Sequence, residues 1–262
     1  MTAGEPALRG DYSRAGPDYA VEQQWDRYTE ADHALYRRLY QRQSHLVRRF
    51  ACTEYLQSLE RLQAGGAIPR FDAVSARLRA ATRWELVAVP GLIPNHAFFD
   101  HLAHRRFPVT VWLRRPEEFD YIVEPDVFHD FFGHVPLLFD PVFADYLQAY
   151  GEGGLKAERL NAIDYLARLY WFTVEFGLVM SGAGLRAYGA GLLSSPLELP
   201  YSVEDPAPAR LPFDLMRIMR TPYVIDRMQE RYFVIDNFDQ LFDATAADFA
   251  PLYARLTQDV SG

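Results

Sequence analysis

Apolar positions recur at helical spacing through the first quarter of the chain. Between Thr29 and Gln63 they fall at Leu35, Leu39, Leu46, Phe50, Leu56, Leu59 and Leu62. This periodicity predicts a helix with one face packed on a core, rather than a groove for a partner. Thr29, followed three residues later by Asp32, is typical of a capping box at the helix start. Gly65 and Gly66 end the pattern.

The rest of the pattern predicts further helices and a few short strands. A short helix is expected around Phe71, Val74 and Leu78. Apolar runs bounded by turn residues predict strands, at residues 85–90, 107–113, 222–225 and 231–236. After the second strand, helices should dominate to about Ser181, including a long one over residues 156–179. Residues 186–210, rich in Gly, Ser and Pro, should be irregular with one hairpin, and residues 238–256 should form one or two helices.

These elements predict a mainly α fold with a few short β-strands. No internal repeat or long low-complexity linker divides the chain, and 262 residues are enough for one large core. We therefore expect residues 1–20 to be a flexible amino-terminal tail and residues 21–262 to be a single domain.

Composition and charge narrow the possible partners. Lys and Arg number 27 against 35 acidic residues, a formal charge of −8, which disfavours nucleic acid and anionic membranes. The single cysteine, Cys52, forms no internal disulfide and fits a reducing compartment; we expect it to be a buried spacer. No apolar run resembles a signal peptide or a membrane span. The expectation is a soluble cytoplasmic protein that works as a monomer and acts on a small molecule.

The stretch EPDVFHDFFGHVPLL, residues 124–138, sets His129 and His134 among apolar side chains. On a regular helix, residues five apart point about 140° away from each other. Gly133 and Pro136 are typical of a helix end, so the last turn can unwind and bring the two imidazoles together. The alternative is two independent core histidines bonded to backbone, and the spacing alone favours that alternative.

Glu175 is the observation that favours a metal site. It lies in LYWFTVEFGLV, residues 169–179, where apolar side chains occupy every helical face. A buried carboxylate must be protonated, paired or bound to a cation, and the nearest basic candidate is Arg168, seven residues earlier. Two imidazoles and a carboxylate are the ligands of the non-haem Fe(II) facial triad. Zinc hydrolases use the same ligand types, so the residues alone leave the metal open.

Other histidines are weaker candidates. His96, His101 and His104 suggest a second metal cluster, but the neighbouring Arg105 and Arg106 would repel a cation. Both histidines of the first long helical pattern, His33 and His45, are expected to be solvated.

Two rival functions use the same motif. The His129-Asp130 doublet also occurs in HD-type phosphohydrolases, which hold two divalent ions and need further His and Asp ligands. A metal-stapled, non-catalytic domain would need a fourth ligand to close the site. Metal content separates these possibilities.

Four segments together resemble the pterin-dependent aromatic amino acid hydroxylases. They are VPGLIPNHAFFDHLAHRRFPVTVWLR, EPDVFHDFFGHVPLL, YWFTVEFGL and AYGAGLLSS. The likeness runs from about residue 20 to about residue 240, and the chain is most similar to the bacterial single-domain phenylalanine 4-hydroxylases. The resemblance implies the catalytic fold of this family and the conversion of L-phenylalanine to L-tyrosine with O2 and a tetrahydropterin. Tyrosine and tryptophan hydroxylases share every motif, so they remain alternatives.

The resemblance also implies roles for individual residues. The iron ligands would be His129, His134 and Glu175. The pterin would contact Gly91, Leu92, Ile93, Phe98 and Asp130.

The substrate carboxylate would be held by Arg114 and Ser194, with Asp126 orienting the arginine and Arg115 as the alternative fork. The side-chain pocket would be walled by Tyr121, Pro125 and Trp171. Animal members of the family carry Thr-Pro at Ile122-Val123 and Glu at Asp130, so the wall of the pocket should differ from theirs.

Overall fold

Helices make up most of this chain, with two small sheets beside them. A computed structural model describes residues 9–225, 227–246 and 248–258. One sheet has two strands and the other has four. The predicted mainly α fold with short strands is confirmed.

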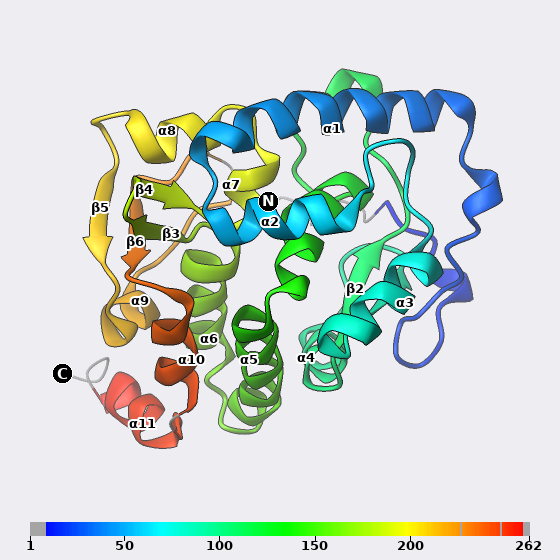
Figure 1. The fold of residues 1–262 in the computed structure, drawn as a ribbon. Coiled ribbons are helices and arrows are strands. Elements are labelled where there is room, and N and C mark those ends of the chain that lie inside the picture. Colours follow the sequence, from blue (N-terminus) through cyan, green and yellow to red (C-terminus); the bar gives the residue numbers. More distant parts are fainter. Residues whose placement is uncertain (1–8, 226, 247, 259–262) are drawn as a thin grey trace, which may run out of the picture.

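The first leucine pattern forms two helices instead of one. α1 (Glu30–Phe50) runs across the top of the molecule in Figure 1, and α2 (Thr53–Leu62) lies beneath it. Between them Cys52 N donates a hydrogen bond to Ala187 O, 3.0 Å away. A contact distant in sequence therefore breaks the helix that the local pattern would have continued.

The start of α1 shows one confirmed prediction and one correction. The capping box is present: Thr29 Oγ1 accepts from Asp32 N at 3.2 Å, and Asp32 Oδ2 accepts from Thr29 N at 2.8 Å. His33 is buried, not solvated as expected, with 8% of its surface exposed. Its Nδ1 accepts from Ile68 N and its ring faces Trp25, so the chain entering α1 covers it.

A small α/β unit follows, made of α3 (Phe71–Thr82), β1 (Glu85–Val89), α4 (Asn95–Ala103) and β2 (Arg106–Thr110). The two strands pair in parallel, with Val89 opposite Thr110. The strand predicted over residues 107–113 therefore ends early. Its partner β1 stops before Pro90, which has no N–H to continue a ladder, so the pairing ends with the bond from Val111 N to Val89 O.

The long helix predicted over residues 156–179 is wrong. This stretch is divided among α5 (Pro141–Arg159), α6 (Ile163–Tyr170), the π-helix η6 (Trp171–Glu175) and β3 (Leu178–Ser181). α5 ends because Asn161 takes a left-handed conformation, with φ of 54°, which Asn tolerates better than most residues. α5 and α6 stand side by side at the centre of Figure 1.

The four-stranded sheet lies at the left of Figure 1, in the order β4-β3-β6-β5. β3 and β4 (Gly184–Ala187) form an antiparallel hairpin, whereas β6 (Arg231–Ile235) is parallel to both its neighbours. The segment predicted to be irregular contains β4, α7 (Ala190–Ser194), α8 (Glu198–Glu204) and β5 (Ala209–Pro212). Most of the glycines and prolines of this segment lie between short helices and strands, so the prediction of an irregular segment was wrong.

The carboxyl-terminal part confirms some predictions and corrects another. The segment 231–236 contains the strand β6, but residues 222–225 form no strand. The expected helices are α10 (Phe238–Ala246) and α11 (Ala250–Gln258), which follow α9 (Leu215–Arg220). Short 3-10 turns occupy η1 (Tyr12–Arg14), η2 (Trp25–Arg27), η3 (Pro116–Glu118) and η5 (Val135–Phe139).

Residues 9–20, the described part of the expected tail, contact the rest of the chain. Tyr12 donates its hydroxyl proton to Leu92 O at 2.8 Å. His101 Nε2 lies 2.8 Å from Asp18 O. These contacts place the segment against β1 and α4, and the boundary at residue 20 stays a prediction.

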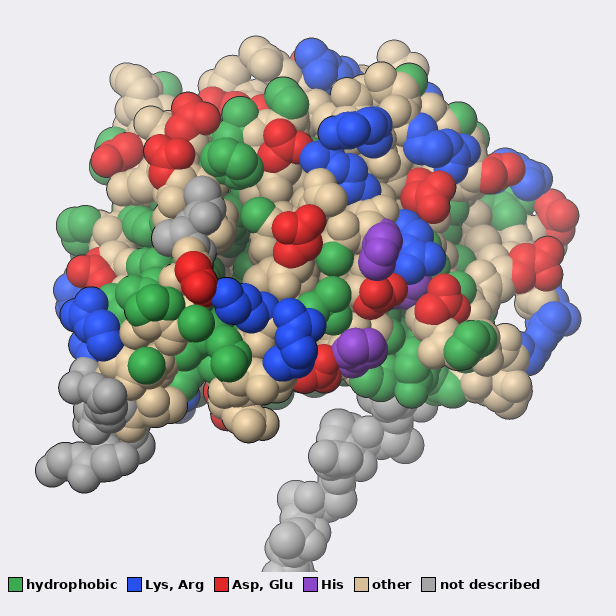
Figure 2. All heavy atoms as spheres, turned by 90° about the horizontal axis from the view of Figure 1, so that it is seen from below, with side chains coloured by type: hydrophobic (Ala, Val, Ile, Leu, Met, Phe, Trp, Pro, Cys, Tyr) green, Lys and Arg blue, Asp and Glu red, His purple; other side chains and the backbone are tan. Residues whose placement is uncertain are grey.

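The core contains many aromatic side chains. Its largest fully buried side chains are Trp84, Tyr36, Tyr55, Tyr146, Tyr150, Tyr188, Tyr232, Phe107, Phe128, Phe131, Phe132 and Phe172. Cys52 is buried among them, as expected. Acidic and basic side chains are intermixed on the face in Figure 2. None of the described helices is both long enough and apolar enough to cross a membrane.

Candidate metal centre and substrate site

His129 and His134 open and close a π-helix, η4 (His129–His134). A π-helix has hydrogen bonds from each residue to the fifth one along, so residues five apart lie over the same side of the helix. The expectation that the last turn unwinds at Gly133 was therefore wrong in its geometry: the turn widens. Its consequence holds, because the two imidazole centroids lie 5.3 Å apart.

Glu175 ends the second π-helix, η6, and faces the two histidines. Its Oε1 lies 3.0 Å from His134 Nε2, and its Oε2 lies 3.7 Å from His129 Nε2. One potential ligand atom from each of the three residues lies within 4.8 Å of the others. Arg168, the basic residue nearest in sequence, points elsewhere and donates to Met219 O.

The donor set fits a divalent transition metal with positions left open. Two imidazoles and one carboxylate, as the only protein ligands, leave room for further ligands on Fe(II). His129 Nδ1 lies 2.8 Å from Ser194 Oγ. When Nδ1 carries the ring proton and donates it to this hydroxyl, His129 has the tautomer that a metal ligand requires. That leaves Nε2 with a free lone pair directed at the carboxylate, as metal-binding histidines require.

The charges of the three groups are coupled. Burial lowers the pKa of His129, and the nearby carboxylate only partly opposes this. Burial also acts to lower the pKa of His134, but Glu175 outweighs it and raises that pKa. Burial acts to raise the pKa of Glu175, but His134 and then His129 hold it below its ordinary value. The centre therefore presents an anionic carboxylate between two ring nitrogens, which suits a cation.

Arg114 and Asp126 form a buried ion pair beside this centre. Arg114 Nε and Nη2 donate to the two carboxylate oxygens, each at 2.9 Å, and Arg114 N donates to the same group. Asp126 also accepts from His129 N at 2.9 Å, which ties the pair to the start of η4. Burial acts to raise the pKa of Asp126, but the Arg114 guanidinium holds it below its ordinary value.

The other edge of this guanidinium is available for a second anion. Within the part of the chain that the structure describes, Nη1 of Arg114 makes no hydrogen bond. The alternative fork, Arg115, is exposed to solvent. The buried arginine is therefore the better placed of the two to form a bidentate contact with a carboxylate.

The predicted pterin loop connects β1 to α4. Gly91 has φ of 155°, and a Cβ there would lie 3.0 Å from both Glu124 Oε1 and the Tyr12 hydroxyl, so only glycine fits. Leu92 beside it is half exposed, and Ile93 is partly buried. One side of the loop is therefore packed against Glu124 and Tyr12, and the other side, which carries Leu92, is open to solvent.

A series of aromatic ring contacts runs from Phe98, just after this loop, to His134 of the candidate metal centre. Phe98 on α4 meets Tyr170 edge to face, with centroids 5.6 Å apart. Tyr170 in turn stacks on His134 at 6.3 Å. Asp130, next to His129, is buried and accepts from Thr110 N at 2.8 Å. Burial raises the pKa of Asp130, so its carboxyl group holds a proton more readily than an exposed one.

The structure brings only some of the residues predicted to wall the substrate pocket close to the candidate metal centre. Trp171 begins η6, four residues before Glu175, and is partly buried. Pro125, also partly buried, precedes Asp126. Tyr121 is 55% exposed and makes no hydrogen bond or ring contact with a described residue of the site. Ser194 lies behind His129 and donates its own proton to Ala190 O at 2.9 Å.

The remaining histidines form no second centre among the described residues. His96 contacts Glu158, His101 contacts Asp18 O, and His104 contacts Asp100 O. The only described group with metal-ligand geometry is the triad. The two-ion site of an HD-type phosphohydrolase therefore has no second set of ligands in that part of the chain.

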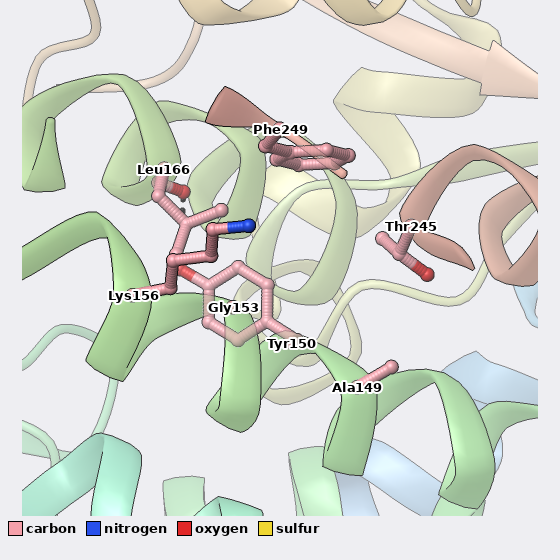
Figure 3. Close-up of a pocket in the computed structure, with 7 residues that line it drawn as sticks. All are labelled: Ala149, Tyr150, Gly153, Lys156, Leu166, Thr245 and Phe249. Atoms are coloured by element: carbon pink, nitrogen blue, oxygen red, sulfur yellow. Dashed lines mark hydrogen bonds between the residues drawn. The ribbon is translucent and has the colours of Figure 1, made fainter. Parts of the chain in front are cut away.

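A separate small cavity is shown in Figure 3. It is lined by Ala149, Tyr150, Gly153, Lys156, Leu166, Thr245 and Phe249. None of the predicted metal, pterin or substrate residues lines it. Tyr150 donates its hydroxyl proton across it to Leu166 O at 3.0 Å.

Sequence reasoning missed two residues that support the site. Tyr170, which links Phe98 to His134, stands in the quoted YWFTVEF segment, five residues before Glu175, where the period of the π-helix would have indicated it. Gln229 accepts from Trp171 Nε1 at 3.0 Å. No local pattern points to Gln229, because its partner lies 58 residues away.

Known proteins are similar to this chain in sequence and in fold over most of its length. The family model of the biopterin-dependent aromatic amino acid hydroxylases matches residues 15–255. A phenylalanine-4-hydroxylase of Chromobacterium violaceum is 59% identical over 240 residues, covering 91% of this chain and 81% of the relative. One of Ralstonia nicotianae is 58% identical over 241 residues, covering 92% and 77%.

Solved structures agree. The iron- and phenylalanine-bound crystal structure of the Chromobacterium violaceum enzyme has a TM-score of 0.89 at 57% identity, covering 93% of this chain and 89% of that one. Its cobalt-bound structure has a TM-score of 0.90 at 58% identity, covering 92% and 87%. With the family model matching nearly the whole chain, the conclusion is direct: the chain belongs to the biopterin-dependent aromatic amino acid hydroxylases.

Proposed function

We propose that this protein is a phenylalanine 4-monooxygenase, which converts L-phenylalanine, O2 and a tetrahydropterin to L-tyrosine. The observation that carries the proposal is the convergence of His129, His134 and Glu175, beside a buried arginine with a free edge. Phenylalanine-4-hydroxylases that are 58% and 59% identical to this chain support the choice of substrate.

The triad would hold a single Fe(II). Iron together with the reduced pterin supplies the two-electron activation of O2 that an aromatic ring needs. The protein's part is to keep three ligands in place and leave the other positions open. Ser194 serves this purpose by holding the His129 ring through Nδ1, and the π-turns place all three ligand atoms on one side.

The pterin would lie against the loop Gly91–Leu92–Ile93, with Phe98 as its stacking partner. Gly91 lets the loop backbone pack closely against Glu124 and Tyr12, because no Cβ intervenes, and this fixes the back of the loop. Asp130 would face the pterin ring. Its carboxyl group, held in place by the bond from Thr110 N, would accept a hydrogen bond from the pterin there.

The amino acid would be held at its carboxylate and enclosed at its ring. Arg114, fixed by Asp126, would present its Nη1 edge to the carboxylate. Ser194 would add to this contact only by giving up its bond to Ala190, because its single proton is already donated there. Trp171 and Pro125 would enclose the aromatic ring, with the exposed Tyr121 at the entrance. Such apolar walls admit a phenyl group and exclude water.

The test is a comparison of kcat/KM for phenylalanine, tyrosine and tryptophan with the same pterin and Fe(II). Phenylalanine should have the highest value and give tyrosine. An apolar pocket discriminates against an added hydroxyl by about a hundredfold at most, so slow oxidation of the other two is compatible with the proposal. A higher value for tryptophan would overturn the substrate assignment and leave the iron and pterin chemistry intact.

A further inference from the structure

The indole of Trp171 is held by a hydrogen bond that belongs to neither the metal centre nor the pterin loop. Its Nε1 donates to Gln229 Oε1 at 3.0 Å. Gln229 is almost completely buried, with 3% of its surface exposed. A buried amide on the chain that enters β6 therefore fixes one edge of a residue that lies four positions from Glu175.

The donor groups of Gln229 are also anchored. Its Nε2 donates to Val224 O at 2.8 Å and to Arg227 O at 3.2 Å. Its backbone N–H donates to Glu198 Oε1 at 2.8 Å. Because both amide hydrogens go to backbone carbonyls, the side-chain oxygen is the atom left to face the indole.

Glu198 ties this arrangement to the fold. It is buried, with 9% of its surface exposed, and lies at the start of α8. Besides Gln229 N it accepts the hydroxyl proton of Tyr232, in β6, at 2.8 Å. A buried carboxylate that accepts two hydrogen bonds is a rigid support, so Gln229 is attached to both α8 and β6.

Stacking fixes the plane of the indole, and the hydrogen bond fixes its direction. Tyr223 stacks on Trp171 with centroids 4.5 Å apart and 17° between the planes. Phe176 also packs against it, at 4.6 Å. A ring held only by stacking can turn over about its terminal torsion, which has two broad minima. The bond from Nε1 to Gln229 selects one of them.

We propose that Gln229 is a positioning residue that sets the orientation of the Trp171 indole and thereby the ring selectivity of the substrate pocket. The inference rests on the proposed function, in which Trp171 walls that pocket. Gln229 itself touches none of the described metal ligands through a hydrogen bond. Its effect should therefore appear in the use of the amino acid, and not in the binding of iron or pterin.

The first test replaces Gln229 by Met, which has a similar length and only a weakly accepting thioether in place of the amide oxygen. Losing one buried hydrogen bond of about 1–1.5 kcal/mol corresponds to roughly a tenfold change. The ratio of kcat/KM for phenylalanine over tryptophan should fall about tenfold, mainly through a higher KM for phenylalanine. Iron affinity and the KM for pterin should stay at wild-type values.

A double-mutant cycle separates this role from general destabilisation. Trp171→Phe removes the indole N–H, so Gln229→Met should change selectivity little further in that background. Tyr232→Phe is the matched control. It removes a hydrogen bond from the same network but leaves the contact between Gln229 and Trp171, so it should lower Tm without changing selectivity.

Each outcome decides the proposal. Unchanged selectivity in Gln229→Met, additive effects in the cycle, or an equal loss in Tyr232→Phe would overturn it, as would a loss confined to iron affinity. If Gln229→Met does not fold, Gln229→Asn keeps a buried amide but withdraws the oxygen from the indole, and the same loss of selectivity is expected. Failure of the proposed function is distinct, because the wild-type protein would then not hydroxylate phenylalanine.

Discussion

Ser194 accepts a hydrogen bond from His129, one of the three proposed metal ligands. Ser194 Oγ lies 2.8 Å from His129 Nδ1 and donates its own proton to Ala190 O, 2.9 Å away. With its proton committed to a carbonyl, the hydroxyl can only accept from the ring. The imidazole is therefore held with its proton on Nδ1, and Nε2 is left to bind a cation.

This relationship predicts the effect of Ser194→Ala. Without its acceptor, the His129 ring loses both its orientation and its preferred tautomer. Iron affinity should fall by about 10- to 100-fold, as is usual when a group supporting a metal-bound histidine is removed. Titration of the apoprotein with Fe(II) measures this directly.

The control for that variant is Ser195→Ala. Ser195 Oγ accepts from Glu198 N at the start of α8 and makes no contact with His129. Losing this hydrogen bond should cost about 1 kcal/mol of stability and leave iron affinity unchanged. Equal iron affinities for the two variants would show that the serine behind the histidine has no role in metal binding.

A second prediction concerns the carboxylate of the triad. Glu175→Ala should abolish iron binding and turnover, since only two ligands remain, while the far-ultraviolet circular dichroism stays that of the folded chain. Either His129→Ala or His134→Ala should have the same effect. Glu152→Ala, which alters an exposed glutamate of α5, is the control. Full activity of Glu175→Ala at saturating iron would rule out the triad.

A third prediction concerns the arginine fork. Arg114→Lys should raise the KM for the amino acid by about 10- to 100-fold, because charge-assisted hydrogen bonds worth about 1.5–3 kcal/mol are lost. The KM for pterin should change little. The variant should also be less stable, since buried Asp126 loses its bidentate partner. Arg115→Lys, at the exposed neighbour, should alter neither KM nor Tm; the reverse pattern would move the fork to Arg115.

A fourth prediction uses the buried carboxyl of Glu198. Burial raises its pKa above the ordinary value of 4.5. Below pH 4.5 the group is protonated in both the folded and the unfolded chain. As the pH rises from there to the raised pKa, only the unfolded chain ionises, so folding stability falls. Glu198→Gln removes this pH-dependent loss of stability, because the amide does not ionise. It keeps an oxygen that can accept the hydrogen bonds from Gln229 N and the Tyr232 hydroxyl.

The measurement is the free energy of unfolding of both proteins in urea between about pH 4 and pH 8. The advantage of Glu198→Gln over the wild type should grow as the pH rises through that window. A difference independent of pH would mean that Glu198 titrates normally.

Local pattern predicted the parts of the fold that depend on neighbouring residues. The capping box at Thr29 and the strand at β6 were correct, because a side chain three residues away or a short apolar run determines them. The break at Cys52 was not predictable, since it depends on Ala187, 135 residues further on in the chain. The left turn at Asn161 carried a readable signal, because Asn favours that conformation.

The candidate site also has features that the local sequence predicted and features that it did not. The chemical types of His129, His134 and Glu175 indicated a metal centre, but the helical period assigned to them was wrong, because π-turns are rare. The contacts behind these residues join segments far apart in sequence, such as Ser194 to His129 and Gln229 to Trp171. Periodicity and spacing contain no information about such pairs.

The amino-terminal contacts limit how far this chain can be shortened. A protein beginning at Val21 would lack the Tyr12 hydroxyl that binds Leu92 O and the Asp18 carbonyl that binds His101. The loop between β1 and α4 would then be released on its outer side, although no residue of the metal centre had been removed. The smallest fragment that keeps this loop, the one proposed to contact the pterin, should therefore begin before Tyr12, which the KM for pterin and the Tm of progressively truncated proteins would measure.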